Sequence, residues 1–192
     1  VINNSDPTSL PSEQWTFGEL EDAVLNVAYG LSKLGLKVGQ RLLIRLDNTS
    51  TYPIVYFAGI AVGLVSIATS SQLTSQEVNF IYADCAPHAI ALSDDLPRGS
   101  IPNGITVLTE NEIRRMMYLG RRGSYAKTRS SDPAYFLYTS GTTSNPKGVI
   151  HAHRVVIGRS PTYQGWYGFR PNDIMLHAGA FNWTYTLGTG LI

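Results

Sequence analysis

Apolar residues recur at helical spacing over several stretches of the chain, and turn residues separate these stretches. Two Thr-x-x-Glu patterns, at 16–19 and 74–77, have the form of a capping box, in which a threonine and a glutamate bond the first backbone N–H groups of a helix. An apolar stripe of helical period follows the first pattern over 20–34. Pro53 suits the first turn of another helix, and residues 110–118 also have a helical pattern. We therefore expect helices at these four places.

Short hydrophobic runs lie between the expected helices, and each has the length of a buried strand. The alternation of strands with helices predicts an α/β fold with a mainly parallel sheet and crossover helices. In such a sheet, ligands bind beyond the carboxyl ends of the strands. The expected strands are 41–46, 64–68, 88–92, 105–108 and 134–138.

The pattern after the last of these strands is less regular. Residues 148–152 are expected to return against it as an antiparallel strand, which would make a hairpin. Residues 153–166 are expected to form a helix that kinks or restarts near Ser160, because a proline follows there. A turn at 170–173 and a strand at 174–177 complete the expected elements.

Composition places the chain among globular proteins and limits its partners. Hydrophobic residues make up 43%, charged residues 15%, and the net charge is +1, so bulk electrostatics gives no indication of nucleic-acid binding. Residues 120–132 are polar and basic without periodicity, which predicts a mobile linker. The basic side chains in and before it are expected to be solvated: Arg114, Arg115, Arg121, Arg122, Lys127 and Arg129.

Two further observations concern the compartment. No apolar run is long enough to cross a bilayer, so we expect no membrane span. The single cysteine, Cys85, excludes an internal disulfide and is expected to be a small buried hydrophobic residue. Both features favour a cytoplasmic protein.

The most informative stretch is 138–148, which reads Tyr-Thr-Ser-Gly-Thr-Thr-Ser-Asn-Pro-Lys-Gly and directly follows an expected strand. Successive backbone N–H groups in such a loop form a nest for anions, and the hydroxyls and the lysine add to it. The loop is not a Walker A loop, because Pro146 replaces a glycine and Gly148 replaces the hydroxyl residue that binds magnesium. The candidate phosphate-binding residues are Thr139, Ser140, Gly141, Thr142, Thr143, Ser144 and Lys147.

This string resembles the phosphate loop of the adenylate-forming superfamily of acyl-CoA synthetases, aryl-CoA ligases and adenylation domains. Ser144 stands where the family usually has glycine. Weaker similarity extends along the chain, at 15–20, 58–65 and 151–154. The resemblance implies that residues 1–192 are a partial amino-terminal, AMP-binding domain: the chain starts without methionine, ends in a hydrophobic segment, and lacks the later motifs and the carboxyl-terminal domain.

The resemblance also implies an activity for the whole protein. Members of the family use ATP with Mg²⁺ to convert a carboxylic acid into an acyl-adenylate, and many then transfer the acyl group to coenzyme A. The family's catalytic lysine and magnesium-linked acidic residue lie in motifs that this chain lacks. We therefore expect no catalytic residue and no metal ligand in this part, which alone would be inactive.

A second site is implied near the end of the chain. Phe181, Asn182 and Trp183 are similar to the motif that builds the wall of the acyl pocket, although acyl-CoA synthetases often have histidine where Asn182 stands. The same aromatic residues could equally be ordinary core. His151 and His153 would share a strand face, as a zinc site requires, but no cysteine or acidic cluster completes that site and we expect structural histidines.

Two alternatives to a carboxylate–CoA ligase remain open. An amino-acid-activating adenylation domain shares the phosphate loop, although such domains usually place an aspartate near Asn182. A non-catalytic fragment that binds a nucleotide or a partner is the other alternative, and its hydrophobic end would favour self-association. The sequence does not identify the acid that is activated.

Overall fold

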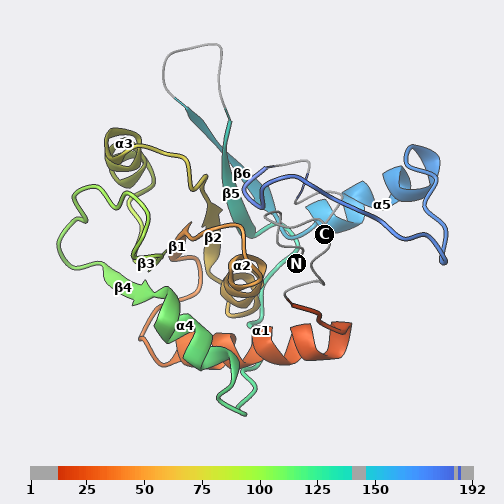
Figure 1. Cartoon of the computed structure of the whole chain (residues 1–192), viewed down its shortest axis with the longest axis horizontal. Coiled ribbons are helices and arrows are strands. Elements are labelled where there is room, and N and C mark those ends of the chain that lie inside the picture. Colours follow the sequence, from red (N-terminus) through yellow and green to blue (C-terminus); the bar gives the residue numbers. More distant parts are fainter. Residues whose placement is uncertain (1–12, 140–145, 184–185, 187–192) are drawn as a thin grey trace.

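The computed structural model describes residues 13–139, 146–183 and 186. Helices and strands alternate through the first two thirds of the chain, except that two strands follow one another at 89–92 and 106–109 (Figure 1). The elements are α1 (Phe17–Ser32), β1 (Arg41–Arg45), α2 (Thr51–Ala61), β2 (Val65–Ala68), α3 (Ser75–Cys85), β3 (Ala89–Leu92), β4 (Thr106–Thr109), α4 (Glu110–Met117), β5 (Pro133–Thr139), β6 (Lys147–Ala152) and α5 (Val155–Gly165).

The described strands form one sheet in the order β4-β3-β1-β2-β5-β6. Neighbouring strands from β4 to β5 are parallel, and β6 is antiparallel to β5. The predicted α/β fold with a mainly parallel sheet and a final antiparallel hairpin is therefore confirmed. In Figure 1 the hairpin of β5 and β6 projects beyond the other strands.

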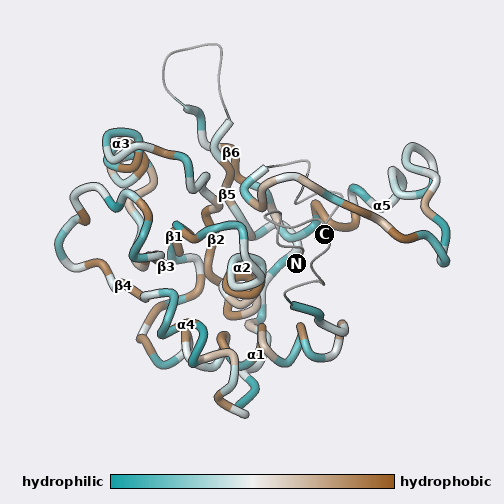
Figure 2. Tube along the Cα trace, in the orientation of Figure 1, coloured by the Kyte–Doolittle hydropathy of each residue, from teal (hydrophilic) through white to brown (hydrophobic). Residues whose placement is uncertain are grey.

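Alternate residues of the strands enter two separate hydrophobic cores. Leu42 and Ile44 of β1 face α1, α2 and α4, whereas Leu43 faces α3. This division follows from the strand geometry, in which successive side chains point to opposite faces. The fold thus has three layers, with the sheet between one group of helices and α3 (Figure 1). Figure 2 shows the hydrophobic residues of α2 and the inner strands at the centre of the chain trace.

Capping boxes start three of the helices. Thr16 with Glu19 and Thr74 with Glu77 were expected from the sequence, and both are present. A third box, Thr109 with Glu112, begins α4 directly after β4. In each box the threonine hydroxyl accepts a bond from the glutamate N–H while the carboxylate accepts one from the threonine N–H, which lowers the pKa of each glutamate.

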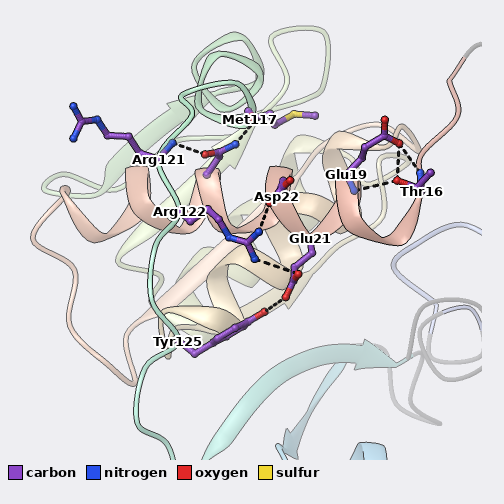
Figure 3. A network of polar contacts seen from close by, with 9 residues as sticks. Thr16, Glu19, Glu21, Asp22, Met117, Arg121, Arg122 and Tyr125 are labelled. Atoms are coloured by element: carbon purple, nitrogen blue, oxygen red, sulfur yellow. Dashed lines mark hydrogen bonds and ion pairs between the residues drawn. The ribbon is translucent and has the colours of Figure 1, made fainter.

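Residues 120–132 have no helix or strand, as expected, and they lie against α1 and α2. Figure 3 shows the contacts to α1, in which the Arg122 guanidinium binds Glu21 and Asp22 and the Tyr125 hydroxyl donates to Glu21 at 3.0 Å. The Gly123 N–H donates to the Leu25 carbonyl at 2.8 Å. Residues 121–126 of this segment are therefore held against α1 and α2.

Gly123 permits this close approach. A Cβ atom added to it would lie 2.7 Å from the backbone nitrogen of Tyr29 and 3.0 Å from the carbonyl carbon of Ala28. Both atoms belong to the backbone of α1, so neither can rotate away. The residue must lack a side chain for the segment to lie where it does.

The strand expected at 174–177 is wrong, because residues 174–178 have no regular structure. Ile174 is 99% exposed and Leu176 is 83% exposed, and no described strand lies beside them to form a ladder. Local hydrophobicity alone suggested a strand, whereas a strand also needs a neighbour. The neighbouring turn at 170–173 is confirmed, since the Asp173 N–H donates to the Arg170 carbonyl at 3.0 Å.

Candidate functional site

The carboxyl ends of β1, β2 and β5 meet at one edge of the sheet because these strands are parallel neighbours. Polar residues follow each strand at this edge, including Asn48 after β1 and Thr69 after β2. Thr139 ends β5 and leads into the predicted phosphate loop. The loop thus leaves the sheet at the edge where parallel α/β sheets bind ligands.

The two strands of the hairpin bring the ends of this loop together. Thr139 pairs with Lys147 across the ladder, and the Thr139 hydroxyl donates to the Lys147 carbonyl at 3.4 Å. Both residues are exposed. Of the predicted phosphate-binding residues these two are described by the structure, whereas Ser140, Gly141, Thr142, Thr143 and Ser144 lie outside the described residues.

Gly148 has a packing role in the hairpin. Its φ is not positive, so its backbone does not require glycine. A Cβ atom there would lie 3.2 Å from Cδ2 of Phe136, and closer than 3.0 Å to Cε2 and Cζ of the same ring. The Phe136 ring therefore occupies the volume that a side chain at residue 148 would need.

The ring of Phe136 in turn supports Tyr138, and Tyr138 contacts helix α3. The two rings stack with centroids 5.0 Å apart. The Tyr138 hydroxyl donates to Oδ2 of Asp84 at 2.7 Å. Burial, followed by this bond to a carboxylate, raises the pKa of Tyr138. Burial also raises the pKa of the neighbouring Cys85 thiol to about 11, which agrees with its expected role as a small buried residue.

The predicted acyl-pocket residues begin at the same sheet edge. The Phe181 N–H donates to Oδ1 of Asn48 at 2.9 Å, and the Phe181 ring stacks on Tyr52 with centroids 5.9 Å apart. Tyr52 lies in the first turn of α2, and its hydroxyl donates to the Thr69 carbonyl at 3.1 Å. Phe181 therefore packs against the segment that leads from β1 into α2.

Of the other two predicted pocket residues, Trp183 is the more exposed. Trp183 is 61% exposed, and its N–H donates to the Ala180 carbonyl at 3.1 Å in a tight turn. Asn182 lies in the same turn and is half-buried. The structure thus brings Phe181 to the edge where the phosphate loop begins, and it leaves the Trp183 side chain largely open to solvent.

His151, one of the two histidines considered as metal ligands, and His177 both make other contacts. The His151 ring stacks on Tyr135 at 4.6 Å, and burial together with the nearby Arg159 charge lowers its pKa. Nδ1 of His177 accepts a bond from the Gly179 N–H at 2.9 Å. Within the described residues no cluster of three or more histidine, cysteine or acidic side chains could hold a metal ion.

Sequence reasoning missed a buried charge at this edge. Arg45 ends β1 and is fully buried, although a charged residue would ordinarily be solvated. Its guanidinium donates to the Ser70 carbonyl after β2 and to the Pro97 carbonyl after β3, the latter at 2.9 Å. Burial lowers the pKa of Arg45. The only signal in the sequence was an arginine closing the run Arg-Leu-Leu-Ile-Arg.

No helix within the described residues is both long and apolar enough to span a membrane.

Known CoA ligases are similar to this chain in sequence. A 4-hydroxybenzoate–CoA/benzoate–CoA ligase of Rhodopseudomonas palustris is 27% identical over 94% of this chain, and a benzoate–CoA ligase of Thauera aromatica is 27% identical over 93%. In both cases the chain spans 36% of the relative's length.

The fold is also found in solved structures. The crystal structure of apo MatB from Rhodopseudomonas palustris superposes with a TM-score of 0.80 at 24% identity, covering 93% of this chain and 37% of that protein. The family model described as AMP-binding enzyme matches residues 4–192, which is nearly the whole chain. This chain belongs to the AMP-binding enzyme family.

Proposed function

We propose that the whole protein is an ATP-dependent carboxylate–CoA ligase, and that this chain contributes its phosphate-binding loop and part of its acid pocket. The ligand partners would be a small carboxylic acid, ATP with Mg²⁺, and coenzyme A. The observation that carries the proposal is the position of Thr139 and Lys147, which hold the two ends of the hydroxyl-rich loop at the carboxyl edge of the sheet. The names of the relatives favour a benzoate-type acid.

Formation of an acyl-adenylate would require this chain to supply positioned hydrogen-bond donors rather than a general acid or base. A carboxylate oxygen attacks the α-phosphorus of ATP, the bond from that phosphorus to the bridging oxygen breaks, and pyrophosphate leaves. Backbone N–H groups, the hydroxyls of residues 139–144 and the Lys147 ammonium would neutralise charge on the departing phosphates. The exposed Lys147 and Thr139 at the mouth of the loop fit a triphosphate.

The described residues supply no acidic cluster for magnesium, so the ion's ligands would come from the phosphates and from the rest of the protein. Phe181 fits one wall of an aromatic acid pocket, because its half-buried ring stacks on the buried ring of Tyr52 at the same edge. A cytoplasmic location is part of the proposal.

The test is exchange of labelled pyrophosphate into ATP by the whole protein. We expect exchange that depends on benzoate or 4-hydroxybenzoate, and a product thioester when coenzyme A is added. Removal of the Lys147 charge in Lys147→Ala should raise the KM for ATP about tenfold or more, since a charge-assisted contact contributes about 1.5–3 kcal/mol. Gly158→Ala in α5 is the matched control, because nothing lies within 4 Å of that position.

Two outcomes would contradict the proposal. Absence of exchange with aromatic, short-chain and long-chain acids would exclude a carboxylate ligase. Exchange with amino acids that exceeds exchange with simple acids would instead favour an adenylation domain. The uncharged Asn182 argues against the second outcome, because such domains usually place an aspartate near this position to hold the substrate ammonium.

A further inference from the structure

The hairpin of β5 and β6 projects past the sheet, so the part that carries the phosphate loop has few neighbours (Figure 1). Its base is buried, since Ala134 and Tyr135 lie in the larger core. Its end is not, since Thr139 and Lys147 are exposed. A strand pair without lateral support frays at such an end. The position of the loop ends therefore depends on whatever holds the upper part of the hairpin.

Helix α3 supplies that support on one face. Phe136 belongs to the core formed with α3, and Tyr138 packs against the edge of the same core. The absence of a side chain at Gly148 lets the Phe136 ring lie across β6, and Tyr138 stacks on that ring. These apolar contacts place the Tyr138 hydroxyl over the last turn of α3, where Asp84 accepts its bond at 2.7 Å.

The location of Asp84 is unfavourable for the helix itself. It is the penultimate residue of α3, where the partial negative charge of the helix terminus repels a carboxylate. No ion pair with Asp84 is formed within the described part of the chain. The bond from Tyr138 is thus the contact that offsets this cost, and it joins two segments that are 54 residues apart in sequence.

We infer that Asp84 is a positioning residue for ATP binding: through Tyr138 it fixes the end of β5, and so the orientation of Thr139 and Lys147 at the mouth of the phosphate loop. The effect on ATP binding rests on the proposed function, whereas the effect of Asp84 on the stability of the hairpin is independent of it. Asp84 would touch neither the nucleotide nor the acid. Its loss should weaken ATP binding and leave the chemical step unchanged.

The test compares Asp84→Ala and Tyr138→Phe in the whole protein. Tyr138→Phe keeps the ring on Phe136 and removes only the hydroxyl. The matched controls are Glu21→Ala and Tyr125→Phe, because these residues form the same kind of tyrosine–carboxylate bond at 3.0 Å, between α1 and the segment 120–132 rather than between α3 and the hairpin (Figure 3). Asp84→Asn keeps an acceptor oxygen for the tyrosine and serves as the conservative rescue.

Two measurements are made on each variant. Without nucleotide, amide hydrogen exchange in 133–139 and 147–152 should be faster in Asp84→Ala and Tyr138→Phe than in the wild type and the controls. In the pyrophosphate exchange assay both variants should raise the KM for ATP about three- to tenfold, the range for a partly exposed bond to a charged acceptor. The kcat should stay within about twofold, as expected when only binding is weakened.

Two further variants distinguish a positioning role of Asp84 from a general loss of stability. The double variant should be no worse than Tyr138→Phe alone, because that variant already lacks the bond to Asp84. Asp84→Asn should restore most of the ATP affinity. Unchanged hydrogen exchange in the hairpin would overturn the inference, and so would a fall in kcat at constant KM. Faster hairpin exchange in Asp84→Ala, with no pyrophosphate exchange even by the wild type, would support the brace and refute the proposed function.

Discussion

Replacing Gly148 by alanine should destabilise the fold, although replacing a strand glycine by alanine usually stabilises a protein. Glycine in a strand costs about 0.5–1 kcal/mol relative to alanine, because it loses more backbone freedom on folding. The backbone of Gly148 accepts alanine, since its φ is not positive. The new methyl group, however, would lie closer than 3.0 Å to two ring atoms of Phe136, inside the closest approach of real side chains.

The loss of stability in Gly148→Ala follows from how tightly the Phe136 ring is packed. Phe136 is 9% exposed, and its ring is held between the core against α3 and the stacked ring of Tyr138. Moving such a ring by more than an ångström is an overpacking change, which costs about 1–3 kcal/mol. For a chain of this size, about 2 kcal/mol lowers the melting temperature by roughly 4–8 °C.

The assay is thermal unfolding followed by circular dichroism, with two companion variants. Gly158→Ala has no atoms within 4 Å and should be neutral or stabilising by up to about 1 kcal/mol, as for a helical glycine. Phe136→Leu removes the ring edge, so the double variant with Gly148→Ala should be less destabilised than the sum of the single variants. A coupling of at least about 1 kcal/mol is expected for two residues in contact.

Two results would refute this reasoning. If Gly148→Ala melted at or above the wild-type temperature, the ring would not occupy the space beside residue 148. If the effects of Gly148→Ala and Phe136→Leu were additive, the destabilisation would come from some other contact.

Three further predictions address other parts of the chain. Gly123→Ala should detach residues 120–132 from α1, because its methyl group would meet the backbone nitrogen of Tyr29 at 2.7 Å; faster trypsin cleavage in that segment would show this, and unchanged cleavage would contradict it. Glu77 has a lowered folded pKa through its bonds with Thr74, so its stabilising effect should be complete above about pH 5 and lost as the pH falls through the folded pKa. Glu77→Gln should therefore flatten the dependence of melting temperature on pH between about 5 and 3, and an unaltered slope would exclude this role. The isolated 192-residue chain should self-associate through its exposed apolar side chains, and Ile174→Lys should shift it towards monomer in light scattering; a monomeric wild type at all concentrations would disprove the prediction.

Local sequence patterns predicted most of the elements because those elements are determined locally. The capping boxes at Thr16 and Thr74 place two helix starts at the predicted residues, since a box needs only the threonine and a glutamate three residues later. Helix α2 begins at Thr51, two residues before Pro53, because proline is accepted anywhere in the first turn. The prediction of a strand at 174–177 was wrong because a strand needs a neighbouring strand, and the periodicity of the sequence does not reveal whether one is present.

The candidate site was predictable only in part for a related reason. The loop string identified Thr139 and Lys147, and the order of elements placed them at the carboxyl edge of the sheet. The contact of Tyr138 with Asp84 joins residues 54 positions apart and leaves no pattern in the sequence. The burial of Arg45 was equally hidden, because its partners are main-chain carbonyls of two loops, and any residue type offers such a carbonyl.

That last feature constrains how the protein can vary. The guanidinium of Arg45 requires the backbone oxygens of Ser70 and Pro97 to point inward, whatever side chains those positions have. The Arg45 contact therefore sets no condition on the side chains at 70 and 97, but a change in the length of either turn would leave a buried guanidinium without its acceptors. Homologues that keep this arginine should accordingly conserve the lengths of both turns more strictly than their sequences.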